Sequence, residues 1–462
     1  MAEKNKKTFK MPHTFEIMMV IILFATLLTW IIPAGQYVRV ENTDGVKVVD
    51  PNQFSFIDRC PVNPLLIPLY IVNSMCKRVD LMLVIIFSGG AFDLISKSGA
   101  LHSAVARVAK VFQNRLYIFI PIMTTIFALI CTTQGVNQFI AFAPVVVMIT
   151  LAMGLDSIVG AAIILLGGAV GFATGTVNPS TTVVAQKIAE LPLFSGIQYR
   201  AVCFVVFLII TNIYLVRYAL KIRKNPELSP MYDLDSQNEQ KDLDIDSFGT
   251  MDVRKTLIII ALVAALAGMV VGSVKFGWDM PELAAVFVGL GIVVGFIAGE
   301  TPSNMSKLFV EGCKKMLTAA MIIGLASAIA SIMSAGKIVD TVVYALASCL
   351  RHTPSFFMAI ANTLINFVIV SGSGQAAAIM PIMIPVSDLL GVTRQTSVLA
   401  YNFGDGFCNY ILPHSTALMG IISAVNIPYD RWLKFMWKLF LIWAVTACIM
   451  TAIAQGIHLG PM

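Results

Sequence analysis

The stretch NFGDGFCNYILPHST, at residues 402–416, places an Asp, a His, two Asn, two Gly and a Pro within apolar sequence. Gly and Pro disfavour a continuous helix, and an ionisable group at membrane depth is costly unless it has polar or charged partners. Non-helical backbone is tolerated in a bilayer only where protein or a water-filled cavity satisfies its N–H and C=O groups. The stretch therefore predicts an apolar helix that is broken beside a polar cavity.

The rest of the chain is typical of a polytopic helical membrane protein. Of its 462 residues, 57% are hydrophobic and 13% are charged, whereas soluble domains carry about 25% charged residues. Several long apolar runs can cross a bilayer at about 1.5 Å per residue. The first run, residues 15–32, is followed by a Pro and by no small-residue cleavage site, so we interpret it as a retained span. Four lysines before it place the N-terminus in the cytoplasm: Lys4, Lys6, Lys7 and Lys10.

The composition disfavours several other classes of protein. Eight cysteines are scattered without paired spacing, so they indicate neither a disulfide framework nor a metal site. The net charge of +6 comes mostly from loop Lys and Arg and gives no nucleic-acid signal. Because there is no nucleophile motif, metal-spaced cluster or nucleotide loop, we predict no catalytic residue, no enzyme activity and no cofactor.

Two parts of the chain resemble each other. The pairs Gln138 and Gln375, Pro144 and Pro381, and Gly154 and Gly391 are each 237 residues apart. A three-residue shift in the alignment then pairs Pro179 with Pro413, and so FATGTVN-PSTT, from residue 172, with FGDGFCN-PHST, from residue 403. Four matches in order, with matching hydropathy, predict an internal duplication.

Charge predicts that the two copies point in opposite directions across the membrane. The last span of the first copy has Arg200 at its start and a basic cluster at its end. The last span of the second copy has Arg431, Lys434 and Lys438 at its start, and its tail has no Lys or Arg. By the positive-inside rule the C-terminus lies outside. Inverted repeats are a signature of many secondary transporters.

We therefore predict an all-α fold of about 10–11 transmembrane helices arranged as two inverted repeats. Each repeat has a re-entrant helical hairpin, with tips at 132–138 and 370–375, and an interrupted helix, at 172–182 and 403–416. The expected units are an N-terminal span and loop (1–79), a first repeat (80–222), a flexible cytoplasmic linker (223–253), connecting spans (254–300) and a second repeat (301–462).

Three long segments carry a resemblance to a known family. Residues 11–37, MPHTFEIMMVIILFATLLTWIIPAGQY, residues 178–196, and residues 371–407 resemble the YfcC group of DcuC-type anaerobic carriers, in the ion transporter superfamily. The resemblance covers nearly the whole chain. It implies the repeats, hairpins and interrupted helices, a homodimer in a bacterial cell membrane, and transport of C4-dicarboxylates or exchange of basic amino acids such as arginine and ornithine.

The sequence departs from that group at two places. Where the group has two adjacent Glu at the first hairpin tip, this chain has Asn137 and Gln138. Where a basic residue is usual in the first long span of the second half, this chain has Ser327. Both changes remove charge from near the predicted cavity.

Asp405 and His414 are the ionisable candidates for binding a substrate or an ion. Asp405 either binds a ligand or caps a broken helix end. His414 either couples transport to protons or is a hydrogen-bonded structural residue, since its counterpart in the first copy is Ser180.

The neutral candidates are hydroxyl and amide residues at the breaks and the hairpin tips. Their oxygens suit Na⁺ and polar solutes, with Na⁺ expected near the tips, or they only satisfy local backbone. They are Thr174, Thr176, Asn178, Ser180, Thr181, Asn402, Asn409, Ser415 and Thr416 at the breaks, and Asn137, Gln138, Ser371, Ser373 and Gln375 at the tips.

The charges near the predicted cavity favour an amino acid as the small-molecule substrate. At about 4 Å, Asp405 would repel a dianion by several kcal/mol. An ammonium at Asp405 and a carboxylate at a hairpin helix N-terminus fit better, because an anion site needs no side-chain cation. The alternative is a C4-dicarboxylate or other organic-anion carrier coupled to Na⁺ or H⁺. A channel is less favoured, because inverted repeats with interrupted helices indicate alternating access.

Overall fold

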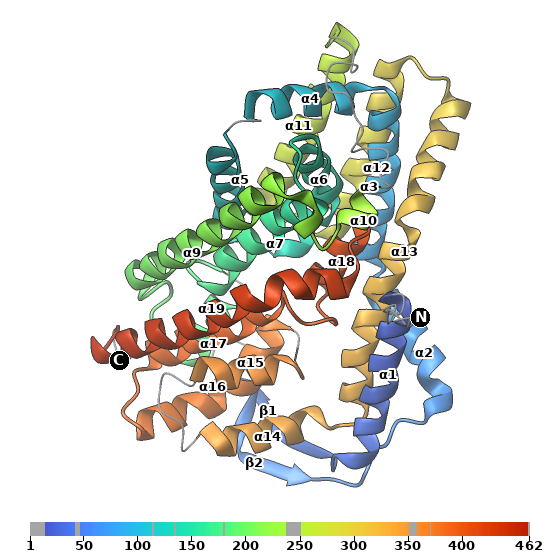
Figure 1. Ribbon diagram of the computed structural model, residues 1–462. Helices are drawn as coiled ribbons and strands as arrows, with labels where there is room; N and C mark the ends of the chain where they lie inside the picture. Colours follow the sequence, from blue (N-terminus) through green and yellow to red (C-terminus); the bar gives the residue numbers. More distant parts are fainter. Residues whose placement is uncertain are drawn as a thin grey trace, which may run out of the picture.

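The computed structural model is mostly helical (Figure 1). It describes residues 14–41, 47–112, 115–133, 135–178, 181–236, 251–350, 358–369 and 371–460. The predicted all-helical architecture is interrupted by one antiparallel hairpin within these ranges, formed by β1 (Gly35–Glu41) and β2 (Lys47–Phe56).

The N-terminal part builds a scaffold with helices from the middle of the chain. Its helical elements are α1 (Thr14–Ile31), η1 (Pro64–Leu66), α2 (Ile67–Lys77) and α3 (Val79–Lys97). Helix α3 packs along α12 (Met280–Ala298) and α13 (Pro302–Ala335), and Figure 1 shows the three helices side by side. The backbones of α3 and α13 touch, because a Cβ atom on Gly312 would lie 2.3 Å from the carbonyl oxygen of Gly89.

The next elements surround a buried central helix. They are α4 (Ala100–Phe112), α5 (Leu116–Ile130), η2 (Val136–Phe142), α6 (Ala143–Ala152), α7 (Ser157–Ala173), α8 (Thr182–Ile188) and α9 (Ile197–Lys224). Helix α7 is apolar on all sides and is buried at every residue except Phe172, as expected of a helix inside a bundle. It ends at Ala173, and α8 begins at Thr182, so a non-helical segment lies where the first interruption was predicted.

Residues 225–236, inside the predicted linker, are packed against the helices. They form η3 (Pro226–Leu228) and α10 (Tyr232–Asp235) before α11 (Val253–Phe276). The Asp235 carboxylate accepts hydrogen bonds from the backbone N–H and hydroxyl of Ser157, at 2.9 and 3.2 Å. Asp233 pairs with Arg431 at 3.0 Å. Asp235 is held here because the start of α7 presents unsatisfied N–H groups and a positive dipole end. Residues 237–250 of the linker lie outside the described residues.

The C-terminal part consists of α14 (Val339–Leu350), α15 (Met358–Asn366), α16 (Gly372–Leu389), α17 (Arg394–Cys408), α18 (Thr416–Ala424) and α19 (Tyr429–Gly456). The predicted break at 403–416 is too long, because α17 continues to Cys408 and only residues 409–415 are non-helical. The two glycines of GDG permit close packing instead of ending the helix. A Cβ atom on Gly404 would lie 2.4 Å from Asn362, and one on Gly406 would lie 2.3 Å from Ala173.

Helices α9 and α19 pack against each other in opposite directions, as the ribbon shows (Figure 1). The Tyr199 hydroxyl donates to the carbonyl of Met450, and the Tyr214 hydroxyl donates to that of Phe435, both at 2.6 Å. Residue numbers thus rise along α9 while they fall along α19. This is the relative direction that their opposite charge distributions predict.

Among the described residues, five helices are long and apolar enough to cross a membrane: α3, α9, α12, α13 and α19. Shorter apolar helical stretches cover residues 18–31, 116–130, 136–152 and 157–173. The count of 10–11 spans, their arrangement as inverted repeats and the re-entrant hairpins stay predictions. These apolar helices are those of an integral membrane protein.

Candidate functional site

Asp405 lies in the last turns of α17 and is 1% exposed. Its Oδ1 accepts a hydrogen bond from Asn366 at 2.7 Å, and its backbone carbonyl accepts from Asn366 at 3.0 Å and from Asn409 at 2.9 Å. Its Oδ2 has no hydrogen-bond partner among the described residues. No described Lys, Arg or His pairs with this carboxylate within 4 Å. Asp405 is therefore a buried carboxylate with one unsatisfied oxygen.

The start of α16 lies against this carboxylate. A Cβ atom on Gly372 would be 2.8 Å from Oδ2 of Asp405 and 2.7 Å from Cγ2 of Thr181. The Tyr401 hydroxyl holds the same turn by donating to the Gly372 carbonyl at 2.6 Å. The N-terminal end of a helix carries a partial positive charge, which stabilises a nearby anion. Asp405 thus lies beside the N-terminal end of α16, the helix end that was expected to face a ligand carboxylate. Asp405 is not itself an N-cap residue, since Ser371 caps α16 and Thr393 caps α17.

Gly372→Ala is expected to lower the free energy of unfolding by about 1–3 kcal/mol, the usual cost of overpacking. The added methyl group would meet Asp405 and Thr181 at distances shorter than van der Waals contact. The control is Gly135→Ala, before η2, where no described residue lies within 4 Å of the added Cβ. The melting temperatures of the detergent-solubilised proteins measure the difference. Equal values for both variants would contradict the tight contact.

The second cluster of contacts joins α17 to the first break. Asn402 donates to the Thr182 hydroxyl at 3.0 Å, and this hydroxyl donates to the Gly175 carbonyl at 3.0 Å. Gly175 has a φ of +58°, and a Cβ atom on it would lie 2.1 Å from Nδ2 of Asn402. The buried Oδ1 of Asn402 and Oγ1 of Thr181 have no partner among the described residues. The first break and α17, far apart in sequence, therefore meet at one polar cluster.

Arg200, on α9, was not among the predicted site residues. Its side chain is buried, with 1% of the residue exposed. It donates to the Gly175 carbonyl at 3.2 Å and to Oε1 of Gln395 at 3.3 Å. Its position near the start of an apolar helix is typical of an interfacial residue, and the sequence interpretation used it only for orientation. The sequence feature that could have identified Arg200 is its lack of basic neighbours, since it is the one Lys or Arg between Lys187 and Arg217.

Two amides of α15 were also missed. Asn362 and Asn366 are four residues apart and share one helix face. Gln375 donates to the Asn362 carbonyl at 3.1 Å, and Asn366 donates to Asp405. The His414 ring is 7% exposed, lies beside the Asn366 backbone, and leaves Nε2 without a hydrogen-bond partner in the described part of the chain. Two buried Asn at helical spacing in an apolar run were the available signal.

Other predicted residues contact their own segment or a different neighbour. The Thr174 hydroxyl donates to the Val170 carbonyl at 2.8 Å, and the Asn178 side chain accepts from the Thr181 N–H at 3.2 Å. The Thr416 hydroxyl donates to Oδ1 of Asn137 at 3.3 Å, which links the first hairpin tip to α18.

Among the described residues, no hydrogen bond joins the remaining predicted residues to the cluster. Ser415 caps α18, Thr176 is buried without a hydroxyl partner in the described structure, and Gln138 is half-buried. Ser371 caps α16 and is exposed, as is Ser373. Ser180 lies outside the described residues.

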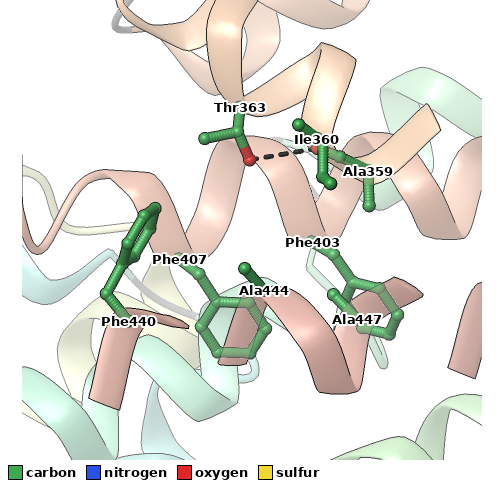
Figure 2. Close-up of a pocket in the computed structure, with 8 residues that line it drawn as sticks. All are labelled: Ala359, Ile360, Thr363, Phe403, Phe407, Phe440, Ala444 and Ala447. Carbon is green, nitrogen blue, oxygen red and sulfur yellow. Dashed lines mark hydrogen bonds between the residues drawn. The ribbon is translucent and has the colours of Figure 1, made fainter. Parts of the chain in front are cut away.

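A separate pocket lies on another face of α17 (Figure 2). Its lining comes from α15, α17 and α19: Ala359, Ile360, Thr363, Phe403, Phe407, Phe440, Ala444 and Ala447. The Thr363 hydroxyl already donates to the Ala359 carbonyl at 3.0 Å, the dashed line in Figure 2. The pocket has no polar side chain free to recognise a polar solute, so the polar cluster around Asp405 is the candidate site.

Comparisons with known proteins identify similar chains along nearly the full length. A protein of Escherichia coli (strain K12) named "Putative basic amino acid antiporter YfcC" is 29% identical over 478 aligned positions, covering 93% of this chain and 94% of that protein. An uncharacterized protein of Haemophilus influenzae is 28% identical over 484 positions, covering 94% and 95%.

Two solved transporter structures also align. The YdaH transporter of Alcanivorax borkumensis is 14% identical with a TM-score of 0.40, covering 97% of this chain and 100% of that one. MtrF of Neisseria gonorrhoeae, described within a class of antimetabolite efflux pumps, is 15% identical with a TM-score of 0.40, covering 98% of each chain.

The family itself follows from the sequence match. The family model described as "C4-dicarboxylate anaerobic carrier" matches residues 11–456. The resemblance inferred from the three sequence segments is thereby confirmed. The chain belongs to the DcuC family of C4-dicarboxylate anaerobic carriers.

Proposed function

We propose that this protein is a secondary active transporter that moves an amino acid across the bacterial inner membrane by alternating access. The observation that carries the proposal is Asp405, a buried carboxylate with an unsatisfied oxygen and no cation paired with it among the described residues. An ammonium group would supply both the missing hydrogen bond and the opposite charge.

Exchange of basic amino acids, such as arginine for ornithine, is the preferred form of this proposal. The Escherichia coli relative carries the name of a basic amino acid antiporter. A basic amino acid has two cationic groups and one carboxylate, and so it suits a site with a buried acid. Neutral amino acids satisfy the same pairing through the α-ammonium group.

Transport of a C4-dicarboxylate or another organic anion is the second candidate, because the family is described by that substrate. Asp405 would then need a cation between itself and the dianion, since two unscreened negative charges repel strongly. Na⁺ near the hairpin tips, or H⁺ carried by Asp405 or His414, would provide that coupling. A channel is less favoured, because the broken helices indicate a carrier.

Orientation and assembly are part of the proposal. The basic residues favour an N-terminus in the cytoplasm and a C-terminus outside. The opposite directions of α9 and α19 support ends on different sides. The N-terminal lysines lie outside the described residues. We expect a homodimer in the lipid bilayer, with no nucleic-acid partner and no cofactor beyond a coupling ion.

Counterflow in proteoliposomes tests the substrate. Vesicles loaded with unlabelled arginine, ornithine, a neutral amino acid or succinate receive a labelled solute from the same panel, with and without a Na⁺ gradient. We expect labelled arginine to accumulate when ornithine or arginine is inside. Accumulation of succinate alone would overturn the amino acid proposal in favour of the second candidate, and conductance far above carrier turnover would favour a channel.

A further inference from the structure

We propose that Arg200 is the cationic residue of the site and binds the carboxylate of the substrate. This inference rests on the proposed transport function and adds a specificity-determining residue to it. It replaces the hairpin helix N-terminus as the partner of the carboxylate, because that helix end already lies against Asp405.

The first argument is that the Arg200 guanidinium is buried and pairs with no carboxylate among the described residues. Both of its hydrogen-bond acceptors are neutral, and the distances of 3.2 and 3.3 Å are at the long end of the usual range. Its Nε is buried and has no acceptor among the described residues. In contrast, Arg39, Arg394 and Arg431 each pair with an Asp or Glu.

The second argument is the chemistry of a guanidinium. It presents five N–H donors in a planar fork that matches a carboxylate. A buried charge without an opposite charge is costly, and in a membrane protein it indicates function by default. A bound carboxylate would supply the opposite charge and the missing acceptors.

The third argument is the position of Arg200 relative to Asp405. Arg200 shares the Gly175 carbonyl with Thr182, and Thr182 accepts from Asn402. Asn402 lies three residues before Asp405, on the adjacent turn of α17. The two ionised groups therefore belong to one connected cluster. No described contact pairs them within 4 Å, so neither ionised group neutralises the other.

A purely structural role makes a different prediction. The Gly175 carbonyl follows the end of α7, where a cation stabilises the negative dipole end. If Arg200 only held this backbone, its loss would lower stability and rate for every substrate alike. If it binds a carboxylate, its loss changes which substrates are preferred.

The test compares arginine with agmatine, which has the same guanidinium chain and a primary amine but no carboxylate. Inhibition of labelled arginine uptake into proteoliposomes gives the preference for one over the other. We expect the unmodified protein to prefer arginine by about tenfold to a hundredfold, the range for one charge-assisted contact. Arg200→Gln should reduce this preference to less than about threefold, and Arg200→Lys should retain an intermediate preference.

Arg217→Gln on the exposed face of the same helix is the matched control and should leave the preference unchanged. If Arg200→Gln is too unstable for uptake assays, Arg200→Lys and the thermal shift caused by each ligand provide the same comparison. An unchanged preference in either Arg200 variant that inserts stably would overturn the inference.

The design separates this inference from the proposed function. If succinate is transported and arginine is not, the amino acid proposal fails, and Arg200 is then tested with succinate against succinamate, its monoamide. Loss of that discrimination in Arg200→Gln would still support a carboxylate-binding role, and its retention would overturn it.

Discussion

Asp405→Asn is expected to lower the initial rate of substrate uptake by about tenfold to a hundredfold. Asn has the same shape as Asp and its oxygen can still accept from Asn366, so the packing around α17 is kept. What is lost is the negative charge beside the unsatisfied oxygen, and one charge-assisted hydrogen bond contributes about 1.5–3 kcal/mol. Each 1.4 kcal/mol corresponds to about a tenfold change. Uptake of the labelled substrate into proteoliposomes, normalised to inserted protein, measures the effect.

The control for the loss of charge is Asp388→Asn. Asp388 lies at the other end of α16 and pairs with Arg394 at 2.9 Å, with both side chains partly exposed. Surface pairs of this kind contribute about 0–1 kcal/mol, so transport should stay within about twofold of the unmodified protein. Equal uptake by Asp405→Asn and Asp388→Asn would assign Asp405 a structural role.

Gly175→Ala is expected to abolish measurable transport and to lower the melting temperature. Two separate costs act at this position. The φ of +58° costs an L-residue about 1–2 kcal/mol. The added Cβ would also lie 2.1 Å from Nδ2 of Asn402 and 2.5 Å from Oγ1 of Thr182, so the contact between the first break and α17 must open. Uptake and thermal unfolding of the purified variant measure both effects.

Gly154→Ala separates the two costs. Gly154 has a φ of +75°, but nothing lies within 4 Å of a Cβ atom at that position. This variant should show only the backbone cost, with transport retained. If Gly175→Ala behaves like Gly154→Ala, the close approach of Asn402 to the first break does not determine the geometry of the site.

The sequence was sufficient to locate the polar region because polar residues and Pro within apolar sequence are compatible with few backbone conformations in a membrane. The residues Asn178 and Thr181, with Pro179 between them, cannot be read as continuous apolar helix, and the first interruption lies where they predict it. Asp405 is identifiable because a carboxylate in an apolar run requires compensation. In contrast, Gly404 and Gly406 were interpreted as helix breakers, whereas tertiary packing against Asn362 and Ala173 keeps the helix intact.

The partners of these residues could not be deduced from local patterns. Asn366 lies 39 residues from Asp405, and Arg200 lies 195 residues from Gln395. Contacts over such separations depend on how the helices are placed, which periodicity and composition do not specify. Arg200 in particular has the sequence context of an interfacial residue, and only its burial against Gly175 distinguishes it from one.

The packed segment at 225–236 adds a further contact between the two halves of the chain to those between α9 and α19. Asp235 contacts Ser157 within the first half, while Asp233 forms a paired contact with Arg431 in the second. A polypeptide divided after Ser236 would leave Asp233 on one fragment and Arg431 on the other. The two fragments would then carry opposite charges that can pair when they associate. Formation of the Asp233–Arg431 ion pair would accompany correct assembly of the two halves.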